Sequence, residues 1–535
     1  MRKTHGFRGC LSFKKASFKK TSMKKYLGAA VASLLIATTV SARDENPGQW
    51  YNDGQAELKR ALQRKPIEGP VKNIILFVGD GMGITTVTAA RIFDGQLRGE
   101  SGEESSLAFE QLPYVALAKT YETDRQVADS AGTMTAIMSG IKTRAGVIGL
   151  NQMAARGNCN SGVGKNVESL LELAEKQSRA TGIVTTTRLT HATPAATFAH
   201  VADRDWESDA DMPEAERAAG CKDVARQLLE FPVGDGLEVA FGGGRSKFLP
   251  QNAADKKGER LDGRDLTQEW LQKFPQGQFV ADSQQLHALD AKKSTHVLGL
   301  FSASHMSYDK ARSREPGGEP SLVEMTRKAI DILQKTPKGF FLMVEGGRID
   351  HAHHSGNAHH ALDETREFAN AVRTAMSMTD SRDTLIIVTA DHGQTMTMSG
   401  YPKRGNPILG KVVGGENADS GDEPEKALDE RPYTTLNYID GPGAIAVHDA
   451  ASKTRVRRDL DKVDTAAPDF VQQALIPLKG GTHGGEDVPI YAGGPWAHLF
   501  QRTVEQNYIF HVMRHALNVP VKSPPKKTKK SANAR

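Results

Sequence analysis

The sequence predicts an α/β fold with a central, mainly parallel β-sheet flanked by helices. Apolar or β-branched runs, each about as long as a buried strand, recur at residues 73–78, 182–187, 340–344 and 385–389. Stretches with helical patterning, such as 167–176 and 357–378, lie between these runs. Strands that alternate with helices along a chain are typical of a parallel sheet. In addition, acidic or imidazole side chains follow three of the four runs.

These polar residues come at the point where each predicted strand ends. Asp80 lies two residues after the first run, Glu345 follows the third directly, and Asp391 and His392 come just after the fourth. In open α/β sheets, ligands bind at the carboxyl ends of the strands, which meet at one edge. We therefore expect these four side chains to gather at one edge of the sheet.

Further acidic and imidazole residues favour a metal site at that edge. Asp350 and His354 are four residues apart, so a helix would place them on one face. His483 lies between glycines that allow close approach of the backbone. Nitrogen and oxygen ligands of this kind suit Zn²⁺, whereas Mg²⁺ would prefer Asp80, Glu345 and a hydroxyl group. The alternatives are an ordinary Asp-Gly turn at Asp80, hydrogen-bonded structural histidines, and a His-rich stretch that binds metals nonspecifically.

Ser130 is the candidate nucleophile. It precedes a predicted helix over 134–138, and the free N–H groups and dipole at a helix N-terminus favour an anion such as a phosphoryl group. The alternative is a serine that only caps the helix. No Gly-x-Ser-x-Gly motif surrounds Ser130, which argues against an ordinary serine esterase.

Composition and charge divide the 535 residues into three parts. Residues 1–42 contain nine basic residues and no acidic ones, and residues 521–535 contain six basic residues and no acidic ones. Without these two ends, the net charge of +5 for the whole chain becomes −10 for residues 43–520. The basic ends are therefore no evidence for nucleic-acid binding, and the tail is predicted to be disordered. Within the folded part, 248–295 are interpreted as a polar excursion and about 395–481 as an insertion with weak periodicity.

The first 42 residues have the pattern of an upstream extension followed by an export signal. A short basic segment is followed by the apolar stretch 27–40 and by small residues, with cleavage expected after Ala42. Met1 and Met23 are both candidate translation starts. We expect a periplasmic or secreted mature protein without a stable membrane span, because the apolar stretch is too short to cross a bilayer comfortably. The alternative is an uncleaved anchor.

Export makes the cysteines informative. Cys159 and Cys221 remain after cleavage, and an even pair in an oxidising compartment predicts one disulfide. Two free thiols are the alternative.

Taken together, the motifs resemble those of the alkaline phosphatase family. The matching stretches span about 415 residues in the family's order: 73–83 (NIILFVGDGMG), 129–132 (DSAG), 190–196 (THATPAA), 344–354 (VEGGRIDHAHH), 389–393 (TADHG) and 481–487 (GTHGGED). The resemblance implies that 43–520 form a catalytic domain that hydrolyses phosphate monoesters through a phosphoserine, with two Zn²⁺ ions and one Mg²⁺ ion.

The resemblance also assigns roles to individual residues. It implies that Ser130 is phosphorylated and that Arg204 binds the phosphate oxygens, although an ion pair between Arg204 and Asp203 or Asp205 is the alternative. The implied metal ligands are Asp350, His354 and His483 for one zinc, Asp80, Asp391, His392 and Ser130 for the other, and Asp80, Thr193 and Glu345 for magnesium. Asp129, His191 and His351 would surround these ligands without binding metal directly.

Several positions resemble the animal-type branch of the family. They are His191, His351 and the pair Cys159 and Cys221, for which the resemblance also implies a disulfide. Gln394 departs from members that carry His at this place. The resemblance further implies a homodimer that binds phosphate monoesters and inorganic phosphate. The competing interpretations are a phosphodiesterase or sulfatase of the same superfamily and an exported metal- or phosphate-binding protein without turnover.

Overall fold

The computed structural model describes residues 46–252, 257–414, 421–444, 446–448, 453 and 455–519. The predicted export signal in 1–42 and the basic tail in 521–535 lie outside these residues, so both stay predictions. All described residues belong to one unit, 40–535. Among them, no helix is long and apolar enough to cross a membrane.

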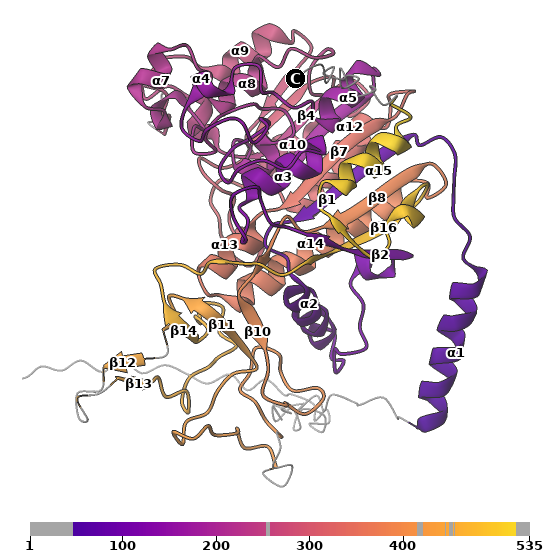
Figure 1. Ribbon diagram of the computed structural model, residues 1–535, viewed down its shortest axis with the longest axis vertical. Coiled ribbons are helices and arrows are strands. Elements are labelled where there is room, and N and C mark those ends of the chain that lie inside the picture. The colour runs from indigo at the N-terminus through magenta and orange to yellow at the C-terminus, as the bar shows by residue number, and fades with distance from the viewer. Residues whose placement is uncertain are drawn as a thin grey trace, which may run out of the picture. The chain divides into compact units, whose positions relative to one another are not determined.

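Ten of the described strands form one sheet, which confirms the predicted α/β architecture (Figure 1). In spatial order they are β17 (Thr503–Glu505), β2 (Tyr114–Lys119), β16 (Val488–Gly493), β8 (Thr384–Thr389), β1 (Asn73–Gly79), β7 (Phe340–Gly346), β3 (Ala180–Arg188), β4 (Val239–Gly243), β6 (Val297–Leu300) and β5 (Gln278–Val280). Only β16 runs antiparallel to its neighbours. The four apolar runs of the sequence are β1, β3, β7 and β8, at the centre of the sheet.

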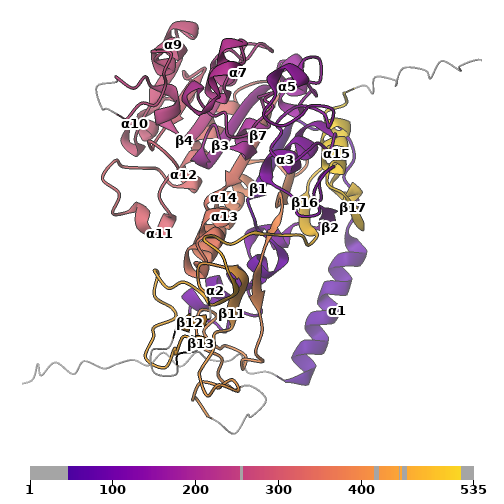
Figure 2. The same cartoon turned by 60° about the vertical axis from the view of Figure 1, so that its left-hand side comes forward.

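Helices cover both faces of this sheet, which explains why its central strands are apolar throughout rather than alternating (Figures 1 and 2). On one face pack α2 (Ile84–Leu97), α12 (Leu322–Leu333) and α14 (Ala358–Met378). On the other face pack α3 (Ser130–Ser139), α5 (Leu170–Lys176), α6 (Ala192–Ala195) and α15 (Tyr508–Ala516). Every residue of β1, β7 and β8 is buried between these layers.

The remaining helices are short, with the exception of α1. They are α1 (Pro47–Gln63), α4 (Cys159–Gly162), α7 (Glu214–Ala218), α8 (Val224–Leu229), α9 (Leu266–Lys273), α10 (Ser283–Ala288), α11 (Asp309–Arg312) and α13 (Arg348–His354), with 3₁₀ turns at Ala108–Gln111, Asp209–Asp211, Arg245–Phe248 and Ala497–Leu499. The stretch 248–295 is not a detached excursion. It contributes β5, which pairs with β6 and extends the main sheet.

The stretch 395–481 contains a smaller sheet of its own. Its strands are β10 (Met396–Met398), β11 (Leu436–Gly441) and β14 (Ala474–Pro477). A two-stranded piece, β12 (Ala446–His448) and β13 (Arg455–Arg457), lies in the same stretch. At its ends, β9 (Gly393–Gln394) pairs with β15 (His483–Gly484), so the chain returns to the point at which it left the main fold.

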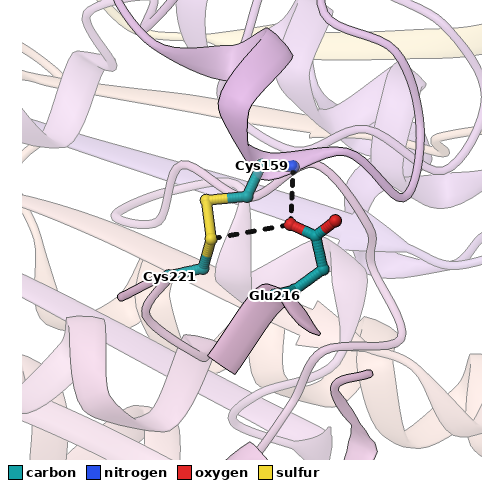
Figure 3. A group of neighbouring side chains, drawn as sticks. All are labelled: Cys159, Glu216 and Cys221. Carbon is teal, nitrogen blue, oxygen red and sulfur yellow. Dashed lines mark hydrogen bonds between the residues drawn. A yellow bond between two sulfur atoms is a disulfide. The ribbon is translucent and has the colours of Figure 1, made fainter. Parts of the chain in front are cut away.

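A disulfide joins Cys159 at the start of α4 to Cys221 just after α7 (Figure 3). The bond closes a long loop and so stabilises the fold by roughly 4 kcal/mol in the chain-entropy account. The Glu216 carboxylate of α7 accepts a hydrogen bond from the backbone N–H of Cys159 at 3.2 Å. Because both sulfur atoms are in the disulfide, this group offers no thiolate to a metal.

Candidate active site

The order β8, β1, β7 places three acidic residues side by side at the carboxyl edge of the sheet. Asp80 follows the central strand, Asp391 follows β8, and Glu345 is the penultimate residue of β7. All three side chains are fully buried. The prediction that the strand ends bring these residues together is confirmed by this arrangement.

His392 and Ser130 meet the carboxylates of Asp80 and Asp391. The His392 Nε2 atom lies 3.4 Å from Asp80 Oδ1 and 3.3 Å from Asp391 Oδ2. Ser130 Oγ lies 3.1 Å from the same Nε2. Asp391 is fixed in place because its Oδ1 accepts hydrogen bonds from the backbone N–H groups of Gly81 and His392. One atom from each of Asp80, Asp391 and His392 lies within 4.8 Å of the others.

A second set of ligands comes from α13 and from the glycine-rich loop at β15. Asp350 Oδ2 lies 3.1 Å from His354 Nε2, because the four-residue spacing places both on one face of the helix. His483 Nε2 lies 3.2 Å from His354 Nε2 and 3.7 Å from Asp350 Oδ1. The other ring nitrogens donate to backbone carbonyls: His354 Nδ1 to Gly481 at 2.5 Å and His483 Nδ1 to Ala128 at 2.7 Å. These bonds turn both Nε2 atoms toward Asp350, an orientation typical of metal-binding histidines.

A third group lies on the other side of Asp80. Thr193 Oγ1 is 3.5 Å from Asp80 Oδ2, and Asp80, Glu345 and His191 each place an atom within 4.8 Å of the other two. Thr185 and Thr187 of β3 donate their hydroxyl groups to Glu345 Oε2. The His351 ring lies beside that of His191, with ring centroids 5.5 Å apart.

Arg204 contacts Asp129, the residue before Ser130, rather than forming a surface ion pair. Its Nη1 is 3.4 Å from Asp129 Oδ2, and its Nη2 donates to His191 Nε2 at 3.2 Å. Asp203 and Asp205, the alternative partners of Arg204, pair instead with Arg156. Asp129 caps α3 by accepting a hydrogen bond from the Gly132 N–H at 3.0 Å, so Ser130 is the first residue of the helix.

This concentration of buried acids requires positive charge. Burial and the neighbouring charge of Asp391 raise the pKa of Asp80 far above its ordinary value. Burial is also the main cause that raises the pKa of Glu345 to about 7. Each of the three carboxyl groups has one buried oxygen without a hydrogen-bond donor: Asp80 Oδ1, Glu345 Oε1 and Asp391 Oδ2. Carboxylate oxygens and imidazole nitrogens with these free positions fit divalent metal ions, which would supply the missing charge.

The imidazoles divide into one basic and several weakly basic groups. Burial opposes protonation of His354, but the charge of Asp350 raises its pKa to about 9. Burial and the nearby His392 lower the pKa of His483 to about 4. Burial likewise lowers the pKa of His351 to about 3. Neutral imidazole is the form that binds a metal.

Supporting residues that the sequence did not reveal hold the ligands in place. Gln394, noted as a departure, donates from its side-chain amide to Asp350. Buried His353 hydrogen-bonds Thr86 at 3.0 Å and the hydroxyl of Tyr438 at 2.7 Å, which connects α13 to α2 and to the small sheet. Asp440 of β11 accepts from the backbone and hydroxyl of Thr482, next to His483. None of these contacts has a local sequence signal, because each joins residues far apart in the chain.

Comparison with known proteins places this geometry in a family. The family model for alkaline phosphatase matches residues 71–519. The chain belongs to the alkaline phosphatase family. It is 45% identical over 506 residues to the tissue-nonspecific alkaline phosphatase of Gallus gallus, covering 92% of this chain and 94% of that one. It is 43% identical over 485 residues to an alkaline phosphatase of Gadus morhua, covering 89% of this chain and 98% of that one.

Solved structures of alkaline phosphatases share the fold. The enzyme from Thermus thermophilus superimposes with a TM-score of 0.61 and 26% identity, covering 87% of this chain and 95% of that one. The enzyme of the Antarctic bacterium TAB5 gives a TM-score of 0.56 at 23% identity, covering 84% and 99%. As an alkaline phosphatase the protein is a hydrolase of phosphate monoesters in a metal-dependent family, and the residue groups described above are its candidate metal sites.

Proposed function

We propose that Ser130 accepts the phosphoryl group of a phosphate monoester, at a site that also holds two Zn²⁺ ions and one Mg²⁺ ion. The observation that carries this proposal is the position of Ser130 Oγ, 3.1 Å from His392 Nε2 and at the first position of a ten-residue helix. A hydroxyl there is directed into the cluster of carboxylates and imidazoles, and the helix N-terminus favours the anionic phosphoryl group.

The ligand types suggest which ion each set would hold. Asp350, His354 and His483 would hold one Zn²⁺, and Asp80, Asp391, His392 and Ser130 would hold the other. Asp80, Thr193 and Glu345 offer only oxygen atoms, which suits Mg²⁺. When bound, such ions supply Lewis-acid stabilisation of the attacking and leaving oxygens of an in-line displacement.

Arg204 and Asp129 would position the phosphate. The guanidinium group of Arg204 forms two N–H contacts with Asp129 and His191 and keeps other donors for phosphate oxygens. His191 accepts from Arg204 through Nε2, and its low pKa, caused by burial and the Arg204 charge, keeps it neutral. Ser130 attacks phosphorus, the alcohol departs, and water then releases inorganic phosphate from phosphoserine.

The test is replacement of Ser130 by Ala in the metal-loaded enzyme. We expect turnover of p-nitrophenyl phosphate to fall at least about thousandfold while the metal content is retained, because the nucleophile is lost but most ligands remain. Acid quenching of the native enzyme with labelled substrate should trap phosphoserine at Ser130, and the variant should give no label. Undiminished turnover in the variant would exclude the phosphoserine route. A bis-p-nitrophenyl phosphate assay gives the diesterase rate for comparison.

The enzyme is further proposed to be exported, to the periplasm or outside the cell. The pattern of residues 1–42 and the disulfide between Cys159 and Cys221 support this, since disulfides persist in oxidising compartments. Mass spectrometry of the mature N-terminus checks it, and a chain that begins at Arg43 is the expected result.

A homodimer is proposed because, among the residues that the structure describes, no element buries the apolar side chains of α1. None of its residues is buried, and Tyr51, Leu58 and Leu62, at helical spacing, are 69%, 51% and 79% exposed. An apolar stripe of this kind is typical of a helix that packs against a partner. Light scattering of the purified enzyme should give twice the mass of the chain, and changing the three residues to Ser should weaken the dimer.

A further inference from the structure

Two consecutive residues near the C-terminus, Gln506 and Asn507, contact elements that carry the active site. They link β17, which pairs with β2 at the edge of the main sheet, to α15, which packs against α3 (Figure 2). Gln506 is fully buried and Asn507 is half-buried. No motif that the sequence analysis connects with catalysis includes either residue.

Gln506 holds the peptide group between two of the candidate metal ligands. Its side-chain Nε2 donates to the Asp391 carbonyl at 2.6 Å, and this carbonyl belongs to the peptide group that joins Asp391 to His392. The N–H of the same peptide group donates to Asp391 Oδ1 at 2.9 Å. Both polar atoms of the peptide group are therefore fixed, one by Gln506 and one by Asp391 itself. Rotation of this group would displace both ligand side chains.

The burial of Gln506 is unfavourable for folding alone. Its Oε1 atom has no hydrogen-bond donor among the residues that the structure describes. A buried polar atom without a partner costs free energy, which an apolar side chain of similar size would avoid. The hydrogen bond from Nε2 to Asp391 gives a reason for an amide at this place.

Asn507 fixes the far end of the helix that begins with Ser130. Asn at the start of a helix commonly caps it with its side chain, but Asn507 makes no such bond to α15. Its Nδ2 donates instead to the carbonyl of Gly140, the residue that ends α3, at 2.9 Å. Because every residue of this ten-residue helix is buried, an anchor at Gly140 also restrains the position of Ser130.

We propose that Gln506 and Asn507 are positioning residues that hold the nucleophile and the neighbouring pair of ligands at a fixed distance from each other. This inference rests on the role proposed above for Ser130. Because Gln506 and Asn507 are adjacent in the chain, one short segment connects the turn of Asp391 and His392 to the end of α3. The distance that this connection maintains is the 3.1 Å between Ser130 Oγ and His392 Nε2.

The two contacts should have separable effects. Loss of the Gln506 amide should weaken the binding of zinc, because Asp391 and His392 are candidate ligands of the same ion. Loss of the Asn507 amide should leave these ligands in place and displace Ser130, so it should lower kcat without weakening zinc binding.

The experiment compares the native enzyme with Q506M and N507L, which keep the size of each side chain but remove its donor. Q177M is the matched control, because Gln177 Nε2 donates to the carbonyl of Leu517 at the other end of α15, at 3.0 Å. Zinc affinity is measured by titration in chelator-buffered solution. The kcat and KM for p-nitrophenyl phosphate and the Tm of each metal-free protein are measured beside it.

We expect Q506M to bind zinc about ten- to a hundredfold more weakly than the native enzyme, as is usual when a residue that orients a metal ligand is lost. Its kcat should fall at least about tenfold at limiting zinc and recover in excess zinc, while the Tm of the metal-free protein stays within about 3 °C of native. N507L should keep the native zinc affinity and lose about fivefold in kcat, which excess zinc does not restore. Q177M should be native in both.

Native zinc affinity in Q506M overturns the inference. So does an equal loss of zinc affinity in Q506M and Q177M, because the contact of Gln506 would then only stabilise α15. Native kcat in N507L contradicts the anchoring of α3. If Q506M does not fold, Q506N replaces it with the same expectation, because its amide is one methylene group too short to reach Asp391.

Failure of the proposed function gives a different result. Native turnover in S130A would remove the role of Ser130 as nucleophile. The zinc affinity of Q506M is measured without turnover, so it would still test whether Gln506 holds Asp391 and His392 in place.

Discussion

The two ends of the main sheet both carry buried carboxyl groups. At the amino end, Glu238 accepts a hydrogen bond from the backbone N–H of Thr181, and Glu175 accepts one from the Thr181 hydroxyl. Asp235 lies nearby but is exposed. Burial raises the pKa values of Glu175 and Glu238 to about 8, so both are neutral at pH 7.

At the carboxyl end the acids are more numerous. Asp80, Glu345 and Asp391 each keep a buried oxygen without a donor, as Glu175 does at the amino end, but here the imidazoles of His392, His354 and His483 converge on the same space. Burial of a carboxyl group therefore does not by itself indicate function. Convergence of several acids with correctly turned imidazoles does, because protonation alone cannot satisfy them all.

Among substitutions of acids at the two ends, the largest effect is expected where an acid of the carboxyl end loses its charge. Changing Asp80 to Asn should lower activity at least about hundredfold and reduce the bound metal, because Asp80 lies between two of the three ligand groups. Elemental analysis and p-nitrophenyl phosphate turnover measure this. E238Q is the control and should keep both. Native activity in D80N would show that the buried acids of the carboxyl end are no more important for function than those of the amino end.

Without the metals, the buried carboxylates at the carboxyl end of the sheet should repel one another and destabilise the fold. We expect chelation to abolish activity and to lower Tm by about 5 °C, since ions that bind only the folded state stabilise it. In D80N, which has one charge less, the same treatment should lower Tm by a smaller amount. Calorimetry before and after chelation, with metal restored as a check of reversibility, makes the comparison. Equal shifts in both proteins would show that charge repulsion is not the cause.

The amino end should affect stability but not catalysis. A carboxyl group whose pKa is raised in the folded state contributes stability that is fully present below its unfolded pKa and is lost as the pH rises through the folded value. For Glu175 that window runs from about 4.5 to about 8. E175Q should therefore gain about 2 °C in Tm relative to the native enzyme between pH 5 and pH 9. A difference in Tm that does not change with pH would contradict this account.

The smallest effect is expected from the small sheet. Tyr438 donates to or accepts from His353 at 2.7 Å, and His353 lies on the helix that carries Asp350 and His354. Y438F removes this hydrogen bond and should cost about 1 kcal/mol of stability and lower kcat a few-fold. T397V, at a partly buried position of the same sheet, is the control. If Y438F had no effect on kcat, the small sheet would not help to hold α13.

Much of this arrangement could be predicted from the sequence. The central strands were recognised because both faces are buried, so their residues are apolar without interruption. Because the carboxyl ends of parallel strands meet at one edge, the sequence predicts that Asp80, Glu345 and Asp391 lie together. The four-residue spacing predicts that Asp350 and His354 share a face of a helix. Among the strands outside the central four, β2, β5, β16 and β17 could not be predicted, since strands with mixed burial have no comparable pattern.

The contacts around the ligands could not be predicted for a different reason. Tyr438 and Asp440 are single polar residues of one strand of the small sheet, and what distinguishes them is a partner distant in the chain. The sequence does not decide between two arrangements of Arg204, because it shows the neighbouring Asp203 and Asp205 but not that both of them form ion pairs with Arg156.

The short pairing of β9 with β15 has a consequence for how such enzymes diversify. Gly393 and Gln394 lie beside Gly484 and His483. The segment between them therefore leaves the main fold and returns to it at the same place. Tyr438 and Asp440 of this segment help to hold the elements that carry the ligands. Its other parts can lengthen, shrink or acquire new surface chemistry without displacing the ligands on either side. Variation in substrate access and assembly can thus accumulate in that segment while the reaction itself is conserved.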